Sequence, residues 1–420
     1  MPGEAPPRTP DRSTQQSRPE PRGRVRDFVA GLLAPLPVKN CWTIAEHAGD
    51  DGPGGMQDLI GRASWNDAAV RADVRDFVTA RLGHPDGILV VDETGDLKKG
   101  LHTVGVQRQY SGTAGKIENC QLAVHLSYAT PLGHTLLDVA LYLPKSWTED
   151  PARRAEAGVP DTVAFATKPQ LARRLIATAV AGGLPCRWVA GDEAYGGDPQ
   201  LAAALRGHRL GYVLAVACSH RVPTGLGVAR ADQIAAGLPR TAWQRLSAGT
   251  GAKGFRYYDW AFIALPLAED THGGHHWMLI RRNRATGELA FYRCWSPEPV
   301  ALHHLVTVAG RRWSIEESFQ ATKTGLGLDQ HQHRRWRAWH RWTTLVIAAH
   351  AFLAAATTVS TESPDGLIAI TVNELRRLFY ALVIDPVRRD ADVIAWSIYR
   401  RRHQDQASAS HYARQALTEP

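Results

Sequence analysis

Two short apolar runs, each ending at an aspartate, constrain the fold of this chain more than any other feature. Residues 87–92 read Gly-Ile-Leu-Val-Val-Asp, and residues 187–192 read Arg-Trp-Val-Ala-Gly-Asp. Such runs are typical of strands that are buried on both faces of a sheet. In open α/β sheets, catalytic groups gather outside the carboxyl ends of the strands. The pattern therefore predicts an α/β fold in which Asp92 and Asp192 lie close together, although each alone is equally well explained as a cap or turn residue.

A third acid lies in residues 311–323, which read Arg-Arg-Trp-Ser-Ile-Glu-Glu-Ser-Phe-Gln-Ala-Thr-Lys. At about 100° per helical residue, Arg312, Glu316 and Lys323 share one face of a helix. Glu317 lies about 100° away from that face and is the weaker candidate for a ligand. Considered alone, the helix is explained by ordinary surface ion pairs.

The two aspartates change this interpretation. Three converging carboxylates repel one another unless cations lie among them. Hard oxygen ligands suit Mg²⁺, or alternatively Mn²⁺, and two such ions can clamp both reacting oxygens of a phosphodiester. The sequence therefore predicts that Asp92, Asp192 and Glu316 are catalytic residues that bind two metal ions. Arg312 and Lys323 are predicted to bind phosphate.

These motifs resemble those of a DDE transposase of a bacterial insertion sequence. One branch of that family has the third-acid motif Tyr-x-x-Arg-x-x-x-Glu-x-x-x-x-x-x-Lys, and Arg312, Glu316 and Lys323 match its spacing. Ala309 stands where the motif has tyrosine. The resemblance covers roughly residues 25–385 and is closest to actinobacterial-type members.

The resemblance implies a ribonuclease H-like mixed sheet flanked by helices, with a β-rich insertion before the third acid and a helical N-terminal region. It implies Mg²⁺-dependent hydrolysis of phosphodiesters at the ends of the element, followed by strand transfer into target DNA. The implied partners are double-stranded DNA, as element ends and as target, and a second copy of the chain on paired ends. The implied location is the cytoplasm, at the nucleoid.

The chain is predicted to have six parts. Residues 1–22 are rich in proline and polar residues and lack apolar residues for a core, which predicts disorder. The parts are a disordered tail (1–22), a helical DNA-binding region (23–85), the first part of the core (86–220), a β-rich insertion (221–298), core helices with the third acid (299–360), and a C-terminal helix with a basic tail that includes residues 400–402 (361–420).

Apolar patterns predict individual elements within the core and the insertion. Alternating residues at 121–128 predict a strand with one buried face. A helix is predicted at 168–181 and a strand at 211–216. In the insertion, strands are predicted at 255–265, 276–280 and 289–295.

Basic and aromatic residues supply the candidate DNA contacts. The net charge of +8 and the pI of about 9.3 favour a polyanionic partner. Trp277 stands where relatives carry an aromatic residue that stacks on a displaced base, but packing within the insertion is the alternative. Residues 331–342, taken as one helix, place Arg334, Arg337 and Arg341 on one face, opposite Trp336 and Trp339. The candidates are Lys98, Lys99, Arg334, Arg337 and Arg341, with Arg71, Arg75 and Arg81 in the N-terminal region; solvated surface charges explain each of them equally well.

Other protein classes fit the sequence less well. Five cysteines show no paired spacing, which argues against a zinc site or a disulfide framework. Residues 342–359 contain His350 and four threonines, so they predict a buried helix and not a membrane span. Two alternatives remain: a domesticated, transposase-derived DNA-binding protein without transposition activity, and a host nuclease of the same fold that cuts without an end sequence.

Overall fold

A computed structural model describes residues 19–225, 227–251, 254–266, 272–359, 370–387 and 393–416. The chain divides into two compact units. One unit comprises Met1–Asp67 and Arg376–Pro420, and the other comprises Ala68–Leu375. The second, larger unit contains all three predicted catalytic acids.

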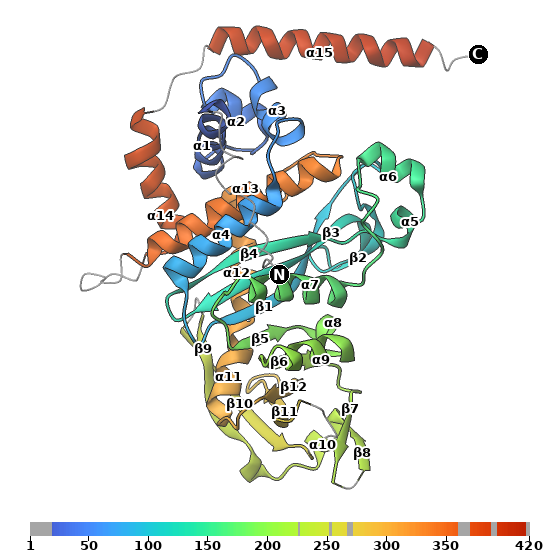
Figure 1. Cartoon of the computed structure of the whole chain (residues 1–420), viewed down its shortest axis with the longest axis vertical. Coiled ribbons are helices and arrows are strands. Elements are labelled where there is room, and N and C mark those ends of the chain that lie inside the picture. Colours follow the sequence, from blue (N-terminus) through green and yellow to red (C-terminus); the bar gives the residue numbers. More distant parts are fainter. Residues whose placement is uncertain are drawn as a thin grey trace, which may run out of the picture. The chain divides into compact units, whose positions relative to one another are not determined.

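The larger unit is built on one ten-stranded mixed sheet (Figure 1). Five of its strands follow the ribonuclease H-like order β4-β3-β1-β5-β6. The pairs β4–β3 and β3–β1 are antiparallel, whereas β1–β5 and β5–β6 are parallel. The predicted fold class is therefore confirmed. The strands are β1 (Ile88–Leu97), β2 (Gln107–Ser111, also paired with β3), β3 (Lys116–Thr130), β4 (Gly133–Leu141), β5 (Trp188–Gly191) and β6 (Gly211–Val216).

The β-rich segment before the third acid extends this sheet instead of forming a separate one. Strand β12 pairs antiparallel with β6, and the order continues as β12-β11-β10-β9. The predicted strands at 255–265, 276–280 and 289–295 correspond to three of these strands. Their bounds are β9 (Gln244–Gly251), β10 (Gly254–Ala264), β11 (His275–Arg282) and β12 (Leu289–Ser296); β7 (Arg221–Thr224) and β8 (Gly227–Arg230) form a separate hairpin next to α10 (Ala231–Ala236).

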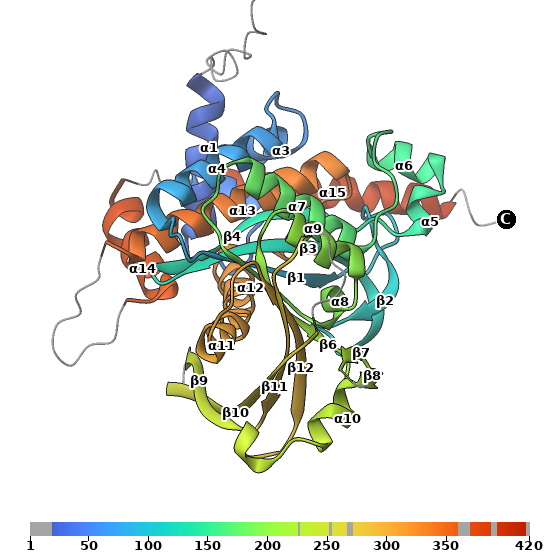
Figure 2. The ribbon, with the colours of Figure 1, turned by 60° about the horizontal axis from the view of Figure 1, so that its bottom comes forward.

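Helices cover both faces of the core strands. Helices α7 (Lys168–Ala181) and α9 (Pro199–Gly207) lie on one side, and α11 (Leu302–Arg311) and α12 (Trp313–Leu326) lie on the other (Figure 2). Strand β3 was predicted from residues 121–128 to bury only one face. That prediction is wrong, because every residue from Cys120 to Thr130 is buried between the two helical layers.

Strand β4 packs against helix α13 (Trp336–Thr357), and side chains of helix α4 (Asp67–Leu82) form ion pairs with it. The backbone N–H of Leu136 donates to Nδ1 of His350 in α13 at 3.2 Å. Residues 342–359, predicted as a buried helix, lie largely within α13, and no helix in the described part of the chain is long and apolar enough to span a membrane.

Two arginines proposed as phosphate contacts have a structural role instead. In α4, Arg71 and Arg75 form ion pairs of 2.9 Å and 2.8 Å with the buried Asp138 of β4. Their guanidinium groups neutralise a carboxylate that burial would otherwise penalise. Arg81 is exposed in the last turn of α4 and stays a candidate for a DNA contact.

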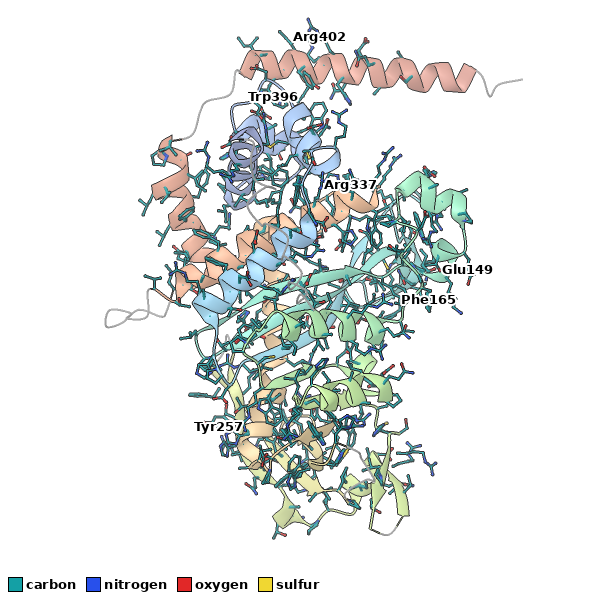
Figure 3. All side chains as sticks on the ribbon, in the orientation of Figure 1. Glu149, Phe165, Tyr257, Arg337, Trp396 and Arg402 are labelled. Carbon is teal, nitrogen blue, oxygen red and sulfur yellow. The ribbon has the colours of Figure 1, made fainter. Side chains whose placement is uncertain are left out.

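The smaller unit joins the two ends of the chain. Trp396, which is labelled in Figure 3, is buried. It donates its indole N–H to the Asp50 carbonyl at 2.8 Å and packs edge-on against Trp42. The basic tail predicted at 400–402 is therefore part of a docked helix. Residues 19–22 are helical, whereas the rest of the predicted disordered tail lies outside the described residues. The helices are α1 (Pro19–Leu33), α2 (Cys41–His47), α3 (Gly54–Gly61) and α15 (Val393–Ala416); α14 (Val372–Phe379) contains the point in the sequence, between Leu375 and Arg376, at which the two units divide.

Candidate active site

Asp92 and Asp192 follow the last paired residues of two neighbouring parallel strands. Strands β1 and β5 pair in register up to Val91 and Gly191. The sequence prediction that the two aspartates meet at one edge of the sheet therefore has a direct structural basis. Strand β1 itself does not stop at Asp92, however, because its pairing with β3 continues to Leu97.

Asp192 is held by the short helix that follows β5. Its Oδ1 accepts the backbone N–H of Ala194 at 2.9 Å, which caps helix α8 (Glu193–Gly196). This is the cap role that an aspartate after a strand can take. Its second oxygen is not needed for this bond, so a cap role and a ligand role are compatible.

Arg312 links the first and third acids. Helix α11 ends at Arg311 and helix α12 begins at Trp313, so Arg312 lies at the junction. Its Nη1 donates to Asp92 Oδ2 at 3.0 Å and lies 3.6 Å from Glu316 Oε1. The predicted helical face of Arg312 and Glu316 is thus turned toward Asp92.

The electrostatics of Asp92 reflect this crowding. Burial raises the pKa of Asp92 to about 8, the charges of Asp192 and Glu316 contribute to the rise, and Arg312 opposes it. Burial likewise raises the pKa of Asp192, with Glu93 adding to the shift. Neighbouring carboxylates with raised pKa values are typical of sites that hold a cation or perform acid–base chemistry.

The donor set suits a hard divalent metal. Asp92, Asp192 and Glu316 offer only carboxylate oxygens, which Mg²⁺ and Mn²⁺ prefer. The positive charge of a metal would also offset the repulsion from Asp192 and Glu316, which adds to the effect of burial on the pKa of Asp92. Within the described ranges, no three His, Cys, Asp or Glu side chains are already arranged as a metal site. The Arg312 guanidinium is the cation that lies between Asp92 and Glu316 in this structure.

Glu317 points to a different partner from Glu316. Its Oε2 lies 3.2 Å from Nε2 of His134 in β4. Contact with His134 lowers the pKa of Glu317. The helical geometry thus separates the two adjacent acids, as the sequence predicted.

Sequence reasoning missed a cluster on the opposite face of β1. Glu93 accepts the phenol O–H of Tyr195 at 2.7 Å and is bonded to the ammonium of Lys168. Adjacent residues of a strand point to opposite faces, so Glu93 faces α7 and α8 while Asp92 faces α12. The alternation of side chains along the strand can be predicted from the sequence. The partners of Glu93 cannot, because Lys168 and Tyr195 lie about 75 and 100 residues downstream.

The lysines near the first acid differ in exposure. Lys99 is exposed, as expected of a residue available to DNA. Lys98 is half-buried and donates to the carbonyl of His331 at 3.1 Å. Lys323 is also half-buried, and its ammonium donates to the Gly95 carbonyl at 3.2 Å. Contact of Lys98 and Lys323 with phosphate stays a prediction.

The three-arginine face predicted for residues 331–342 does not form. Helix α13 begins at Trp336, so Arg334 precedes the helix. Arg341 is only 2% exposed, because the tertiary packing of α13 covers the side that the helical pattern assigned to DNA. Arg334 and Arg337 are exposed, and Figure 3 shows Arg337 on the surface near the start of α13.

Trp277 lies within the β-rich part of the sheet. It is 6% exposed, pairs in register with Cys294 of β12, and stacks on His275 at a ring-centroid distance of 5.8 Å. It also lines a cavity of about 410 Å³ with Arg206 and Arg293. The geometry favours the packing role that the sequence left open, and base stacking by Trp277 stays a prediction.

Comparisons with known proteins identify the family of this chain. The profile of the DDE superfamily endonucleases matches residues 13–251, which is more than half of the 420 residues. The chain belongs to the DDE superfamily endonucleases. The profile of the transposase DDE domain matches residues 164–352 of this DDE endonuclease, a range that contains Asp192 and Glu316.

A probable transposase for insertion sequence element IS701 from Microchaete diplosiphon is 30% identical to this DDE endonuclease over 206 residues. The match covers 47% of this chain and 51% of that protein, so the chain spans about half the length of its curated relative. The crystal structure of the NurA nuclease from Sulfolobus solfataricus aligns with 64% of this chain and 84% of that one. At 9% identity and a TM-score of 0.27, that likeness carries no structural argument.

Proposed function

We propose that this DDE endonuclease is the transposase of an insertion sequence, acting on double-stranded DNA at the element ends and at the target. The observation that carries the proposal is the meeting of Asp92, Asp192 and Glu316 around Arg312 at the end of the β1–β5 pair. The IS701 transposase relative supports the same activity. A DNA substrate would place the protein at the nucleoid, in the cytoplasm.

The proposed reaction has two steps with one geometry. In the first, the oxygen of water attacks the phosphorus at an element end and the 3′ oxygen leaves, which creates a free 3′-OH. In the second, that hydroxyl attacks a target phosphodiester and displaces its 3′ oxygen. Each strand-transfer step exchanges one phosphodiester for another, so it needs no external energy source.

The acidic and the basic residues of the site have different proposed roles. Asp92, Asp192 and Glu316 would hold two Mg²⁺, or alternatively Mn²⁺. When bound, such ions activate the attacking oxygen and stabilise charge on the reacting phosphate. Arg312, which already contacts two of the acids, is placed to neutralise a phosphate oxygen, as is Lys323 on the same helix.

The finer classification is part of this proposal. Arg312, Glu316 and Lys323 keep the spacing of the Tyr-Arg-Glu-Lys branch, and Ala309 is half-buried in α11 at the tyrosine position. Action as a homodimer on paired ends, and DNA binding by residues 23–85, follow from the same resemblance. Retention of all three acids speaks against a domesticated protein without activity.

Asp92→Ala tests the assignment of the acids. We expect it to abolish Mg²⁺-dependent nicking of duplex oligonucleotides that carry the two ends of the encoding element, because one carboxylate of the set is lost. Binding of the same oligonucleotides, measured by gel shift, should persist. Full nicking by this variant would refute the proposed site.

The matched control is Glu317→Ala, since Glu317 neighbours Glu316 but pairs with His134. It should keep most of the nicking activity. Duplexes with scrambled ends separate a transposase from a general nuclease: cutting of scrambled DNA at the same rate would favour the host nuclease.

A further inference from the structure

A buried polar cluster surrounds the end of Lys323. The Lys323 ammonium donates to the Gly95 carbonyl and lies 3.8 Å from Asp96 Oδ1. On the other side of the carboxylate, His331 Nε2 lies 3.6 Å from Asp96 Oδ2. Lys98 donates to the carbonyl of His331, which encloses the cluster further. Lys323 is therefore held by the protein instead of extending freely into solvent.

Asp96 lies four residues after Asp92 on β1, and both aspartates contact a cation of the helix opposite. Side chains alternate along a strand, so Asp92 and Asp96 face the same way and lie about 13 Å apart. On the facing helix, their partners Arg312 and Lys323 are about 16 Å apart. These two acid–cation contacts attach α12 to β1 at both ends, and Glu316 lies between them.

The charges of the cluster suit this role. Burial alone would raise the pKa of Asp96, but its neighbours His331, Lys98 and Lys323 lower it. Burial lowers the pKa of His331, which favours its neutral form. The charges nearest to the Asp96 carboxylate are then the ammonium groups of Lys323 and Lys98, while Asp329 is a second, more distant acid.

We propose that Asp96 is a positioning residue that fixes the ammonium of Lys323 for contact with DNA phosphate. A lysine side chain has many rotamers, and fixing it in advance avoids the entropy loss when phosphate binds. Asp96 itself touches neither the reacting atoms nor the predicted metal ligands. The role of Lys323 rests on the proposed function, but its restraint by Asp96 does not.

The restraint is tested without DNA by acetylating the full-length protein and following Lys323 by peptide mass spectrometry, with exposed Lys99 as internal reference. Asp96→Asn keeps the shape of the side chain and removes its charge. We expect Lys323 to react about tenfold faster, relative to Lys99, in this variant than in the wild type. Asp329→Asn removes a nearby negative charge without breaking an ion pair and should produce no comparable change.

An unchanged Lys323 reactivity in a folded Asp96→Asn protein would overturn the proposal, as would an equal rise in Asp329→Asn. Circular dichroism shows whether Asp96→Asn folds. If it does not, Asp96→Ser decides in its place, because it removes the same charge with a smaller side chain: Lys323 must again become more reactive, and constant reactivity overturns the proposal.

The consequence for activity is tested by a double-mutant cycle in the element-end nicking assay. Asp96→Asn should lower kcat about tenfold, the size typical of residues that orient a functional group. In a protein that already carries Lys323→Met, Asp96→Asn should cause no further decrease in kcat, because the ammonium that Asp96 positions is absent. If the fold-decrease in kcat of the double variant equals the product of the two single decreases, Asp96 acts independently of Lys323. A wild type that cuts no ends would refute the proposed function, and the acetylation result would still decide the restraint.

Discussion

At the scale of single residues, the site depends on which polar groups are buried and what faces them. Asp92 is surrounded by like charges and one guanidinium, and Asp96 by two ammonium groups and a neutral imidazole. Burial raises the pKa of Asp92, and the charges of Asp192 and Glu316 add to the rise; at Asp96 the neighbouring groups outweigh burial and lower the pKa, although both residues lie on the same face of β1. An additional cation would therefore stabilise the charged form of Asp92, whereas the carboxylate of Asp96 already has cations beside it.

A buried histidine predicts how the protein responds to acid. Nδ1 of His350 accepts the N–H of Leu136, and burial lowers the pKa of His350 from 6.5 to about 3. The unfolded chain therefore binds more protons than the folded one between these values, so the stabilising contribution is complete above pH 6.5 and is lost as pH falls. In His350→Gln, the amide oxygen can accept the same N–H but does not titrate. When the pH falls from 7 to 5, the free energy of unfolding of this variant should therefore decrease by about 1–2 kcal/mol less than that of the wild type.

Urea unfolding at the two pH values measures this difference. His303→Gln, which replaces an exposed imidazole on α11, is the matched control and should lose as much stability as the wild type. An equal loss for all three proteins would mean that His350 is not buried against β4.

At the scale of elements, strands and helices with a clear period were predictable from the sequence. Helix α7 and strand β6 have the predicted bounds, because their apolar residues follow one period between clear end signals. Residues 93–97 were missed as the second half of β1, since Glu-Thr-Gly-Asp-Leu has no apolar alternation. Pairing with β3 determines that they are a strand, and such pairing is invisible in a local pattern.

The same limit applied to the site. The three acids were found because each stands in a local signature. Asp96, Lys168 and His331 were not, because their partners are distant in sequence and the contacts exist only after folding. Arg341 was misplaced for the related reason that its burial depends on tertiary packing.

Helix α8 depends on a glycine for its contact with β6. A Cβ added to Gly196 would lie 1.7 Å from the Ala215 carbonyl, so α8 would have to move, and Asp192 at its N-terminus would move with it. We expect Gly196→Ala to cost about 1–3 kcal/mol of unfolding free energy and to impair DNA nicking.

Thermal unfolding and the nicking assay measure the two effects. Gly197→Ala is the control, because its added methyl would approach no atom closer than 4.0 Å. If Gly196→Ala were as stable and active as Gly197→Ala, the close packing of α8 on β6 would be wrong.

At the scale of the whole molecule, the chain combines a core that matches its family with a unit made from both chain ends. The two family profiles together span residues 13–352, so α15, at Val393–Ala416, lies beyond them. Trp396 and the ion pair between Arg400 and Glu46 join α15 to the N-terminal helices. A segment outside the family match is thus integrated into a packed unit.

The net charge of +8 makes a prediction for DNA binding by the whole chain. Each arginine that contacts a phosphate displaces condensed counterions, so the affinity falls as salt rises, with a log–log slope of about −0.9 per contact on duplex DNA. Exposed Arg337 is placed for such a contact, and Arg337→Gln should reduce the steepness of the slope by about 1. Arg62→Gln is the comparison, because Arg62 is also exposed but already paired with Asp58 at 2.9 Å. Fluorescence anisotropy of a labelled duplex over a salt series measures both slopes; identical slopes for the two variants would remove Arg337 from the DNA-binding surface, whereas a change in Arg337→Gln alone would place α13 against the DNA backbone.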